Sequence, residues 1–132
     1  MKNKGKRSLE ELKKKLTTEQ YNICFLKATE APFSGKYTYH KAKGMYVCVV
    51  CNEPLFSSKT KFDSNSGWPS FGDVINRGNV KLEVDNSLGM VTAEGLCASC
   101  GAHLGDVFDD GPTKTAKRYC INSLALNFEK SK

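Results

Sequence analysis

Short runs of alternating apolar and polar residues fill the chain from Phe33 onward, and clusters of turn-forming residues separate them. Such alternation is typical of half-buried β-strands, because successive side chains of a strand point to opposite faces of the sheet. The separating clusters contain the Asn, Asp, Gly and Pro residues that turns favour. The pattern predicts strands at residues 46–50, 80–84, 90–93, 104–108 and 117–128.

The segment before Phe33 has a different pattern, which predicts two short helices. Residues 8–11 and 17–20 each place a hydroxyl residue three positions before Glu or Gln, the arrangement of a capping box. We expect one helix from residue 8 to about 16 and a second from 17 to about 26, with Cys24 on the second. Because the chain has no internal repeat and no alternation of strands with long helices, the predicted class is mainly β, with antiparallel sheets.

The 132 residues suit a single domain, which we expect to span residues 8–132 after a disordered basic tail at residues 1–7. The net charge of +6 is concentrated near the N-terminus, where seven basic and two acidic residues give the first 15 residues a net charge of +5. A solvated tail accounts for this basicity. Since no basic stripe with interleaved aromatic residues runs through the rest of the chain, we do not expect it to bind nucleic acid.

The sequence also limits the expected compartment. No apolar run approaches the roughly 18 residues of a membrane span, and no apolar segment follows the N-terminal charges as in a secretory signal. Paired cysteines in a chain without an export signal favour metal or redox chemistry over structural disulfides. The cytoplasm is therefore the expected compartment. A mitochondrial transit peptide is the weaker alternative, because the N-terminal segment is rich in lysine rather than arginine.

Four of the six cysteines form two CxxC pairs, Cys48 with Cys51 and Cys97 with Cys100. Two such pairs supply four thiolates for a tetrahedral zinc ion, and a site with four protein ligands leaves no open position, so the expected zinc is structural. The 45 residues between the pairs exceed the spacing of a compact zinc finger, so the metal would join distant parts of one domain. Iron is the competing metal, and dithiol redox motifs or free buried thiols are the alternatives without a metal.

Cys120 has no paired cysteine near it, and Arg118 precedes it by two residues. A fixed positive charge beside a thiol stabilises the thiolate, which is the nucleophilic form. If residues 117–128 form one strand, Arg118, Cys120 and Asn122 share one face, which apolar residues continue as far as Phe128. This arrangement suits an activated nucleophile. The alternative is a buried, inert cysteine beside a surface arginine.

Two further residues are candidates for a site around this thiol. Trp68, the only tryptophan, lies in the stiff Gly-Trp-Pro-Ser-Phe turn. His103 follows the second cysteine pair, so a metal site would fix its position, and beside a reactive thiol it could donate a proton. Taken alone, a single tryptophan or histidine more often has a structural place in the core.

Taken together, these segments closely resemble the methionine-R-sulfoxide reductase B family. The resemblance rests on Gly-Trp-Pro-Ser-Phe at residues 67–71, both cysteine pairs, His-Leu-Gly at 103–105, Asp-Gly-Pro at 110–112 and Arg-Tyr-Cys-Ile-Asn-Ser at 118–123. The motifs occur in the family's order and extend over nearly the whole chain outside the basic tail. The resemblance implies an Mss4-like fold of two antiparallel sheets, with the active site on one face and zinc on the distal side.

The family reduces the R epimer of methionine sulfoxide, free or in proteins, to methionine. By resemblance Cys120 is the nucleophile and becomes a sulfenic acid, which thioredoxin or another thiol reduces. His103 would help protonate the sulfoxide oxygen, and Asn122 would hydrogen-bond near the reacting centre. The resemblance also implies that Arg118 stabilises the thiolate, that Trp68 and Phe71 pack on the substrate, and that Asp110 orients polar partners. We expect a monomer.

Two positions depart from the family pattern. Ser66 stands where many members have a resolving cysteine, and serine cannot form the disulfide that removes a sulfenic acid. Two routes then remain: Cys24 resolves Cys120 after the N-terminal helix moves, or an external thiol reduces Cys120 directly. Asp106 stands where members usually have a second histidine, and a carboxyl group donates a proton less readily at neutral pH.

These departures leave three classes of function to compare. The first is the reductase, the second is a zinc-dependent interaction module that has kept the fold and lost catalysis, and the third is a thiol sensor or metal buffer. Turnover of the R-sulfoxide that depends on Cys120 would distinguish the first class from the others. We favour the enzyme, because a sensor or buffer would leave the complete motifs around Trp68 and Cys120 unexplained.

Overall fold

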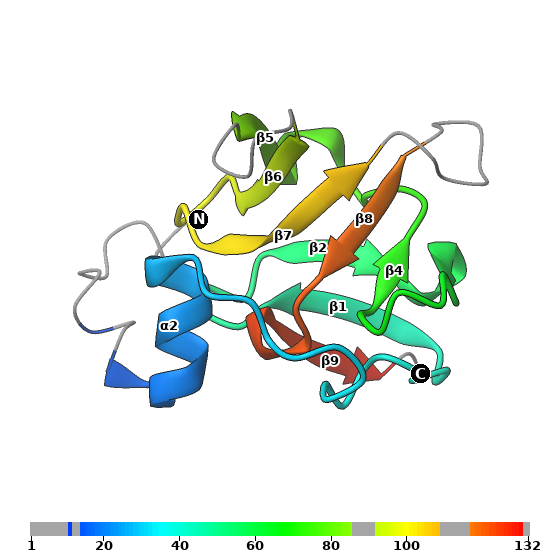
Figure 1. Ribbon diagram of the computed structural model, residues 1–132, viewed down its shortest axis with the longest axis horizontal. Helices are drawn as coiled ribbons and strands as arrows, with labels where there is room; N and C mark the ends of the chain where they lie inside the picture. The colour runs from blue at the N-terminus through cyan, green and yellow to red at the C-terminus, as the bar shows by residue number, and fades with distance from the viewer. Residues whose placement is uncertain (1–10, 12–13, 86–91, 109–116, 131–132) are drawn as a thin grey trace.

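The computed structural model describes residue 11 and residues 14–85, 92–108 and 117–130. Within these ranges nine strands follow helix α2 (Thr18–Leu26), as Figure 1 shows. The strands are β1 (Gly44–Cys48), β2 (Pro54–Ser57), β3 (Lys61–Phe62), β4 (Ser70–Phe71), β5 (Val80–Asp85), β6 (Thr92–Cys97), β7 (His103–Phe108), β8 (Arg118–Ile121) and β9 (Leu126–Lys130). Three short 3-10 helices occupy Ser58–Thr60, Arg77–Asn79 and Ser123–Ala125.

The strands form two antiparallel sheets, which confirms the predicted class. The smaller sheet has the order β2-β1-β9, and the larger has the order β3-β4-β8-β7-β6-β5. Helix α2 contacts β7 of the larger sheet and the 3-10 helix that precedes β9 of the smaller one. It therefore lies at one end of the sheets (Figure 1). Of the helices in the described ranges, none has the length and apolar character that crossing a membrane requires.

Helix α2 begins as the sequence predicts. The Thr17 hydroxyl accepts a hydrogen bond from the Gln20 N–H, and the Gln20 side chain accepts one from the Thr17 N–H, which completes the capping box. Lys27, with φ of 61°, ends the helix. Ile23 and Cys24 form its buried face. The helix predicted for residues 8–16 falls mostly outside the described residues, as does the basic tail.

Most of the predicted strands are present with shifted ends. Strand β1 ends at Cys48, two residues before the predicted end, because the Cys48 carbonyl accepts a turn hydrogen bond from the Asn52 N–H. Strand β6 covers Thr92–Cys97 rather than residues 90–93, the first two of which lie outside the described residues. The single strand predicted for residues 117–128 is wrong, because β8 and β9 belong to different sheets.

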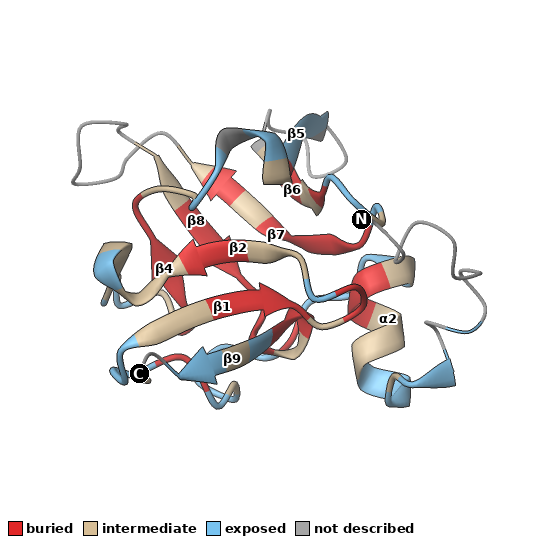
Figure 2. Ribbon diagram, turned by 180° about the vertical axis from the view of Figure 1, so that it is seen from behind, coloured by how far each residue is buried: buried red, intermediate tan, exposed pale blue. Residues whose placement is uncertain are grey.

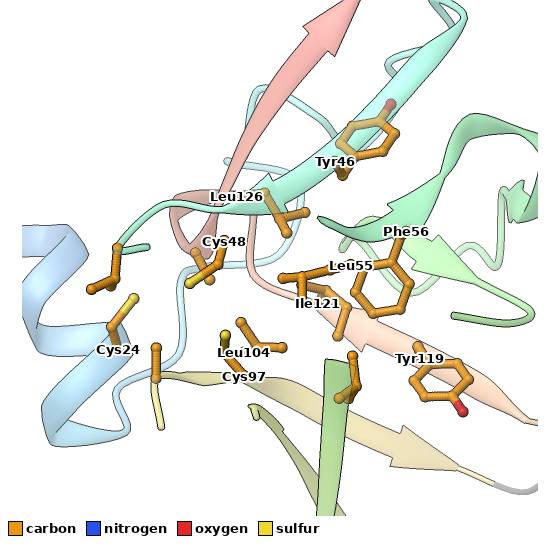
Figure 3. Packing of buried hydrophobic residues seen from close by; sticks show 14 of the residues in the cluster. Cys24, Tyr46, Cys48, Leu55, Phe56, Cys97, Leu104, Tyr119, Ile121 and Leu126 are labelled. Carbon is orange, nitrogen blue, oxygen red and sulfur yellow. The ribbon is translucent and has the colours of Figure 1, made fainter. Parts of the chain in front are cut away.

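The core lies between the two sheets, and aromatic rings fill much of it. Phe56 of β2 stacks on Phe71 of β4 with ring centroids 4.4 Å apart, and it also meets Tyr119 of β8 at 5.6 Å. Buried residues colour the facing strands red in Figure 2, and Figure 3 shows Ile121 and Leu104 packed among them. The outer face of β8 is thereby left to carry the site.

Candidate active site

Cys120 opens into a hollow of about 370 Å³ on the face of the larger sheet turned away from this core. Strands β7 and β8 form part of the wall, and neighbouring loop segments form the rest. The hollow brings together most of the side chains predicted from the sequence. The members used below are Ser66, Trp68, Asp106, Arg118, Cys120 and Asn122.

Strand register places the polar groups of the hollow in one row. Cys120 of β8 pairs with Asp106 of β7 on one side and with Ser70 of β4 on the other. Directly paired residues of adjacent strands project to the same face of a sheet. The thiol therefore lies between a carboxyl group and a hydroxyl group, both fixed by backbone hydrogen bonding.

The sulfur of Cys120 is surrounded by hydrogen-bond donors, although only 8% of the residue is exposed. Nη1 of Arg118 donates to it at 2.9 Å, and the guanidinium also packs on the Phe108 ring, 4.3 Å from its centroid. A charged donor at this distance makes a charge-assisted hydrogen bond to the sulfur. The predicted pairing of Arg118 with Cys120 on one face is therefore confirmed.

Three serine hydroxyls form a second group of partners, which the sequence analysis did not identify. The hydroxyl oxygens of Ser66 and Ser70 lie 3.5 and 3.6 Å from the Cys120 sulfur. Ser64 joins the two, with its oxygen 2.7 Å from that of Ser66 and 2.6 Å from that of Ser70. A hydroxyl can rotate to donate or accept. The cluster can therefore hydrogen-bond either a thiolate or the oxygen of a sulfenic acid through rotation of its hydroxyl groups alone.

Glu30 holds two walls of the hollow in place, and the sequence analysis missed it as well. Its carbonyl accepts a hydrogen bond from the Trp68 indole at 3.0 Å, and its N–H donates to the Asn122 side chain at 3.0 Å. Its carboxylate accepts from the Leu124 N–H at 3.0 Å. The Asn122 amide also donates to the Leu104 carbonyl at 3.0 Å. Trp68 and Asn122 are thus oriented by one residue that is only 7% exposed.

Three candidates do not join this group. Phe71 is fully buried against Phe56 in the core, so it cannot form a wall of the hollow. His103 is buried, and its Nδ1 lies 3.2 Å from the Ile23 carbonyl of α2; among the described residues it does not line the hollow. Asp110 lies outside the described residues.

The four paired cysteines meet away from this hollow. Cys48 is the last residue of β1 and Cys51 lies in the turn that follows, and likewise Cys97 is the last residue of β6 and Cys100 lies in the turn after it. Their sulfurs all lie within 4.8 Å of one another, with Cys48 and Cys100 3.7 Å apart and Cys51 and Cys97 3.6 Å apart. A tetrahedron with metal–sulfur bonds of about 2.3 Å has edges of about 3.8 Å, so the set fits one metal ion. Such an ion would join the two sheets.

Hydrogen bonding within the cluster separates the pKa values of its thiols, because it raises the pKa of Cys48 well above its ordinary value and lowers that of Cys51. Bonds from Cys100 and Cys48 lower the pKa of Cys51, which stabilises its thiolate. Cys24 of α2 points toward the same region, as Figure 3 shows, and is only 2% exposed. Burial raises the pKa of Cys24 to about 12, and the negative charge of Cys97 adds to the increase. The Cys24 thiol therefore stays protonated at neutral pH.

Comparison with known proteins places the chain in one family. A SelR domain matches residues 16–130. The chain is 55% identical over 123 residues to the peptide methionine sulfoxide reductase MsrB of Methanosarcina barkeri, covering 93% of this chain and 87% of that protein. It is 55% identical over 125 residues to the protein of the same name from Pseudomonas fluorescens, covering 94% and 95%.

A mouse protein is similarly close but longer. The chain is 55% identical over 121 residues to the mouse methionine-R-sulfoxide reductase B3, mitochondrial, and the match covers 92% of this chain and 48% of the mouse protein. The chain thus spans about half the length of that relative, whereas it spans most of the archaeal and bacterial proteins. The match over residues 16–130 and these identities show that the chain belongs to the methionine-R-sulfoxide reductase B family.

Proposed function

We propose that this protein is a peptide-methionine (R)-S-oxide reductase, which reduces the R epimer of methionine sulfoxide, free or in proteins, to methionine. The observation that carries the proposal is the 2.9 Å hydrogen bond from Arg118 to the Cys120 sulfur, inside a hollow that Trp68 lines. The names of the archaeal and bacterial relatives support the same reaction. The interaction-module class does not explain a buried thiol with a charged donor.

The first chemical step is attack by the Cys120 thiolate on the sulfoxide sulfur. Arg118 stabilises the thiolate, and the indole of Trp68 provides an apolar surface for the substrate methyl group. The attack joins the two sulfurs; the protonated oxygen then passes to the Cys120 sulfur as its bond to the substrate sulfur breaks, and the S–S bond breaks, so methionine leaves and Cys120 becomes a sulfenic acid. The sulfoxide is reduced by two electrons and the thiol is oxidised by two.

The sulfoxide oxygen needs a proton before its bond to sulfur can break, and we assign its delivery to Asp106. This carboxyl group lines the hollow and is the cross-strand neighbour of Cys120. His103 then has a positioning role: its Nδ1–H donates to the Ile23 carbonyl and ties α2 to the start of β7. Asn122 offers its amide side chain beside the reacting centre.

An external dithiol such as thioredoxin returns Cys120 to its reduced form in this proposal. One reductant thiol attacks the sulfenic acid and releases water, and the second displaces Cys120 and closes the reductant's disulfide. The burial of Cys24 beside the paired cysteines favours this route over internal resolution by Cys24. Mass spectrometry after one turnover without reductant tests the choice: we expect a sulfenic acid on Cys120, and a Cys24–Cys120 disulfide would contradict it.

We further propose one structural zinc ion held by the four paired cysteines. A d¹⁰ ion with no geometric preference of its own suits a closed set of four thiolates, and it would cross-link the fold rather than take part in chemistry at the hollow.

The remaining assignments are a single domain over residues 8–132, a monomeric state and a cytoplasmic location. Metal analysis, light scattering and cell fractionation test the zinc ion, the monomeric state and the location separately from activity.

Reduction of separated R and S methionine sulfoxide with dithiothreitol tests the activity itself. We expect turnover of the R epimer only, abolished in Cys120→Ser and retained in Cys24→Ser, which serves as the matched cysteine control. Lack of turnover by folded, zinc-loaded protein would reject the reductase and favour the interaction module. Turnover that survives Cys120→Ser would reject the assigned nucleophile.

A further inference from the structure

Two aromatic side chains of the segment between α2 and β1 are exposed together. Phe33 is 59% exposed and Tyr39 is 55% exposed, and their rings stack with centroids 6.2 Å apart and planes 25° from parallel. Phe33 adopts a φ of 65°, in the left-handed region that bulky residues rarely enter. A strained backbone that presents an apolar ring to solvent is not explained by packing, and such strain is often found at binding sites.

The Gly67 carbonyl fixes this aromatic pair beside the hollow. It accepts a hydrogen bond from the Phe33 N–H at 2.7 Å and another from the Thr38 hydroxyl at 3.3 Å. Gly67 lies between Ser66 and Trp68, which both line the hollow. A Cβ on Gly67 would come within 2.6 Å of the Pro32 side chain, so only glycine permits this close approach.

The segment that carries the pair also continues along the hollow. Thr29 lines it, and Glu30 bonds the Trp68 indole and the Asn122 amide. Figure 1 shows this segment leaving α2 and passing the end of β8 before it turns toward β1. The aromatic pair therefore lies next to the part of the wall that Thr29, Ser66 and Trp68 form.

We propose that Phe33 and Tyr39 form a docking surface for an apolar side chain that flanks methionine sulfoxide in an unfolded polypeptide. Methionine is usually buried, so the residues that flank it become accessible when the protein unfolds. The hollow holds one side chain, whereas a flanking residue extends over its rim onto the two rings. Free methionine sulfoxide has no such residue and does not reach them. This inference rests on the proposed function, because it names the substrate class of the same hollow.

The test compares substrates that differ only in their flanking residues. Steady-state kcat/KM is measured for free R-methionine sulfoxide, for a peptide with leucine on both sides of the sulfoxide, and for one with serine there. In Phe33→Asn, chosen because asparagine tolerates the left-handed conformation, and in Tyr39→Ser, we expect kcat/KM for the leucine peptide to fall about five- to tenfold. The free amino acid and the serine peptide should change by less than about twofold. Leu26→Asn, which removes an exposed apolar side chain of α2, is the matched control.

A binding measurement separates this proposal from the reductase itself. The oxidised peptides are titrated into Cys120→Ser protein, with the fluorescence of Trp68 as the signal, so no turnover is needed. We expect the leucine peptide to bind more tightly than the serine peptide, and both aromatic substitutions to remove that difference. Equal affinity for the two peptides, or an equal loss of kcat/KM on all three substrates, would overturn the docking surface. Inactive wild-type protein that still prefers the leucine peptide would reject the reductase alone.

Discussion

The hydroxyl of Ser66 lies 3.5 Å from the Cys120 sulfur, at the position where many family members have their resolving cysteine. A sulfur in its place needs to approach only to a bond length of about 2.05 Å, which side-chain rotation can accomplish. We expect Ser66→Cys to form a disulfide with Cys120 after one turnover, where the unmodified protein retains a sulfenic acid. Mass spectrometry without added reductant gives the answer. Ser34→Cys, on the surface, should leave the sulfenic acid in place, and a persistent sulfenic acid in Ser66→Cys would contradict the geometry.

Asp106 offers a second test at the level of one side chain. A proton donor must be protonated, so the rate falls as pH rises through its pKa, and an imidazole ordinarily titrates about 2.5 units above a carboxyl group. We therefore expect Asp106→His to raise kcat at neutral pH and move the alkaline limb of the pH–rate profile upward. Asp106→Asn should lower kcat by about 100-fold, the lower bound for loss of a general acid. An unchanged profile in both variants would remove Asp106 from proton delivery.

The sequence identified Cys120 and Arg118, which the structure brings together, but it missed the serine partners of the sulfur and misplaced Phe71 and His103. Ser70 and Phe71 are consecutive in β4, so once Ser70 faces Cys120, Phe71 must face the core. His103 is three positions from Asp106 in β7, but a β-bulge lies between them and interrupts the alternation of faces, and the His103 Nδ1 lies against the Ile23 carbonyl of α2. The motifs contain the correct residue types, but the face of each residue depends on strand bounds that the pattern placed only approximately.

At the level of elements, the segment 117–128 shows what alternation alone cannot predict. Apolar and polar residues alternate both before and after Asn122, so one continuous strand and two separate strands would give the same sequence pattern. In the structure the chain leaves the larger sheet after Ile121, and a 3-10 helix carries it to the smaller sheet. The Asn122 side chain bonds Glu30 and Leu104 instead of continuing a ladder. These partners are distant in sequence, so the break was not evident from local pattern.

The segment between α2 and β1 should position the hollow through Glu30. Glu30→Ala removes the acceptor of the Leu124 N–H and frees the segment that holds Trp68 and Asn122. We expect kcat/KM to fall about tenfold, as for loss of one buried hydrogen bond, and the Trp68 emission to shift to longer wavelength as water reaches the indole. Glu30→Gln keeps the acceptor oxygen and should restore both properties. Glu19→Ala on the exposed side of α2 is the control, and a Glu30→Ala protein with wild-type emission would show that Glu30 does not position Trp68.

At the level of the whole molecule, the paired cysteines could hold one metal ion between the two sheets that share the core. One pair follows β1 of the smaller sheet and the other follows β6 of the larger sheet, so the four sulfurs meet where the sheets approach each other. The spacing of the pairs predicted that they come together from distant parts of one domain, and the four sulfurs do meet. That they meet between the two sheets could not be derived from the sequence, because it depends on the order of strands that are distant in sequence.

Removal of the metal should therefore destabilise the entire fold rather than one loop. Binding to four thiolates is coupled to folding and contributes several kcal/mol, and for a chain of this size we expect the metal-free protein to melt at least about 10 °C lower. Thermal unfolding with and without a strong chelator measures the change, and added zinc should reverse it.

Cys100→Ser should lose the metal, whereas Cys24→Ser, which changes a residue beside the cluster but outside it, should keep one ion per chain. Lowering the pH should release the metal before the fold is lost, because protons compete for the thiolates. Equal melting temperatures for the loaded and metal-free protein would show that the sheets are held together by their shared core alone.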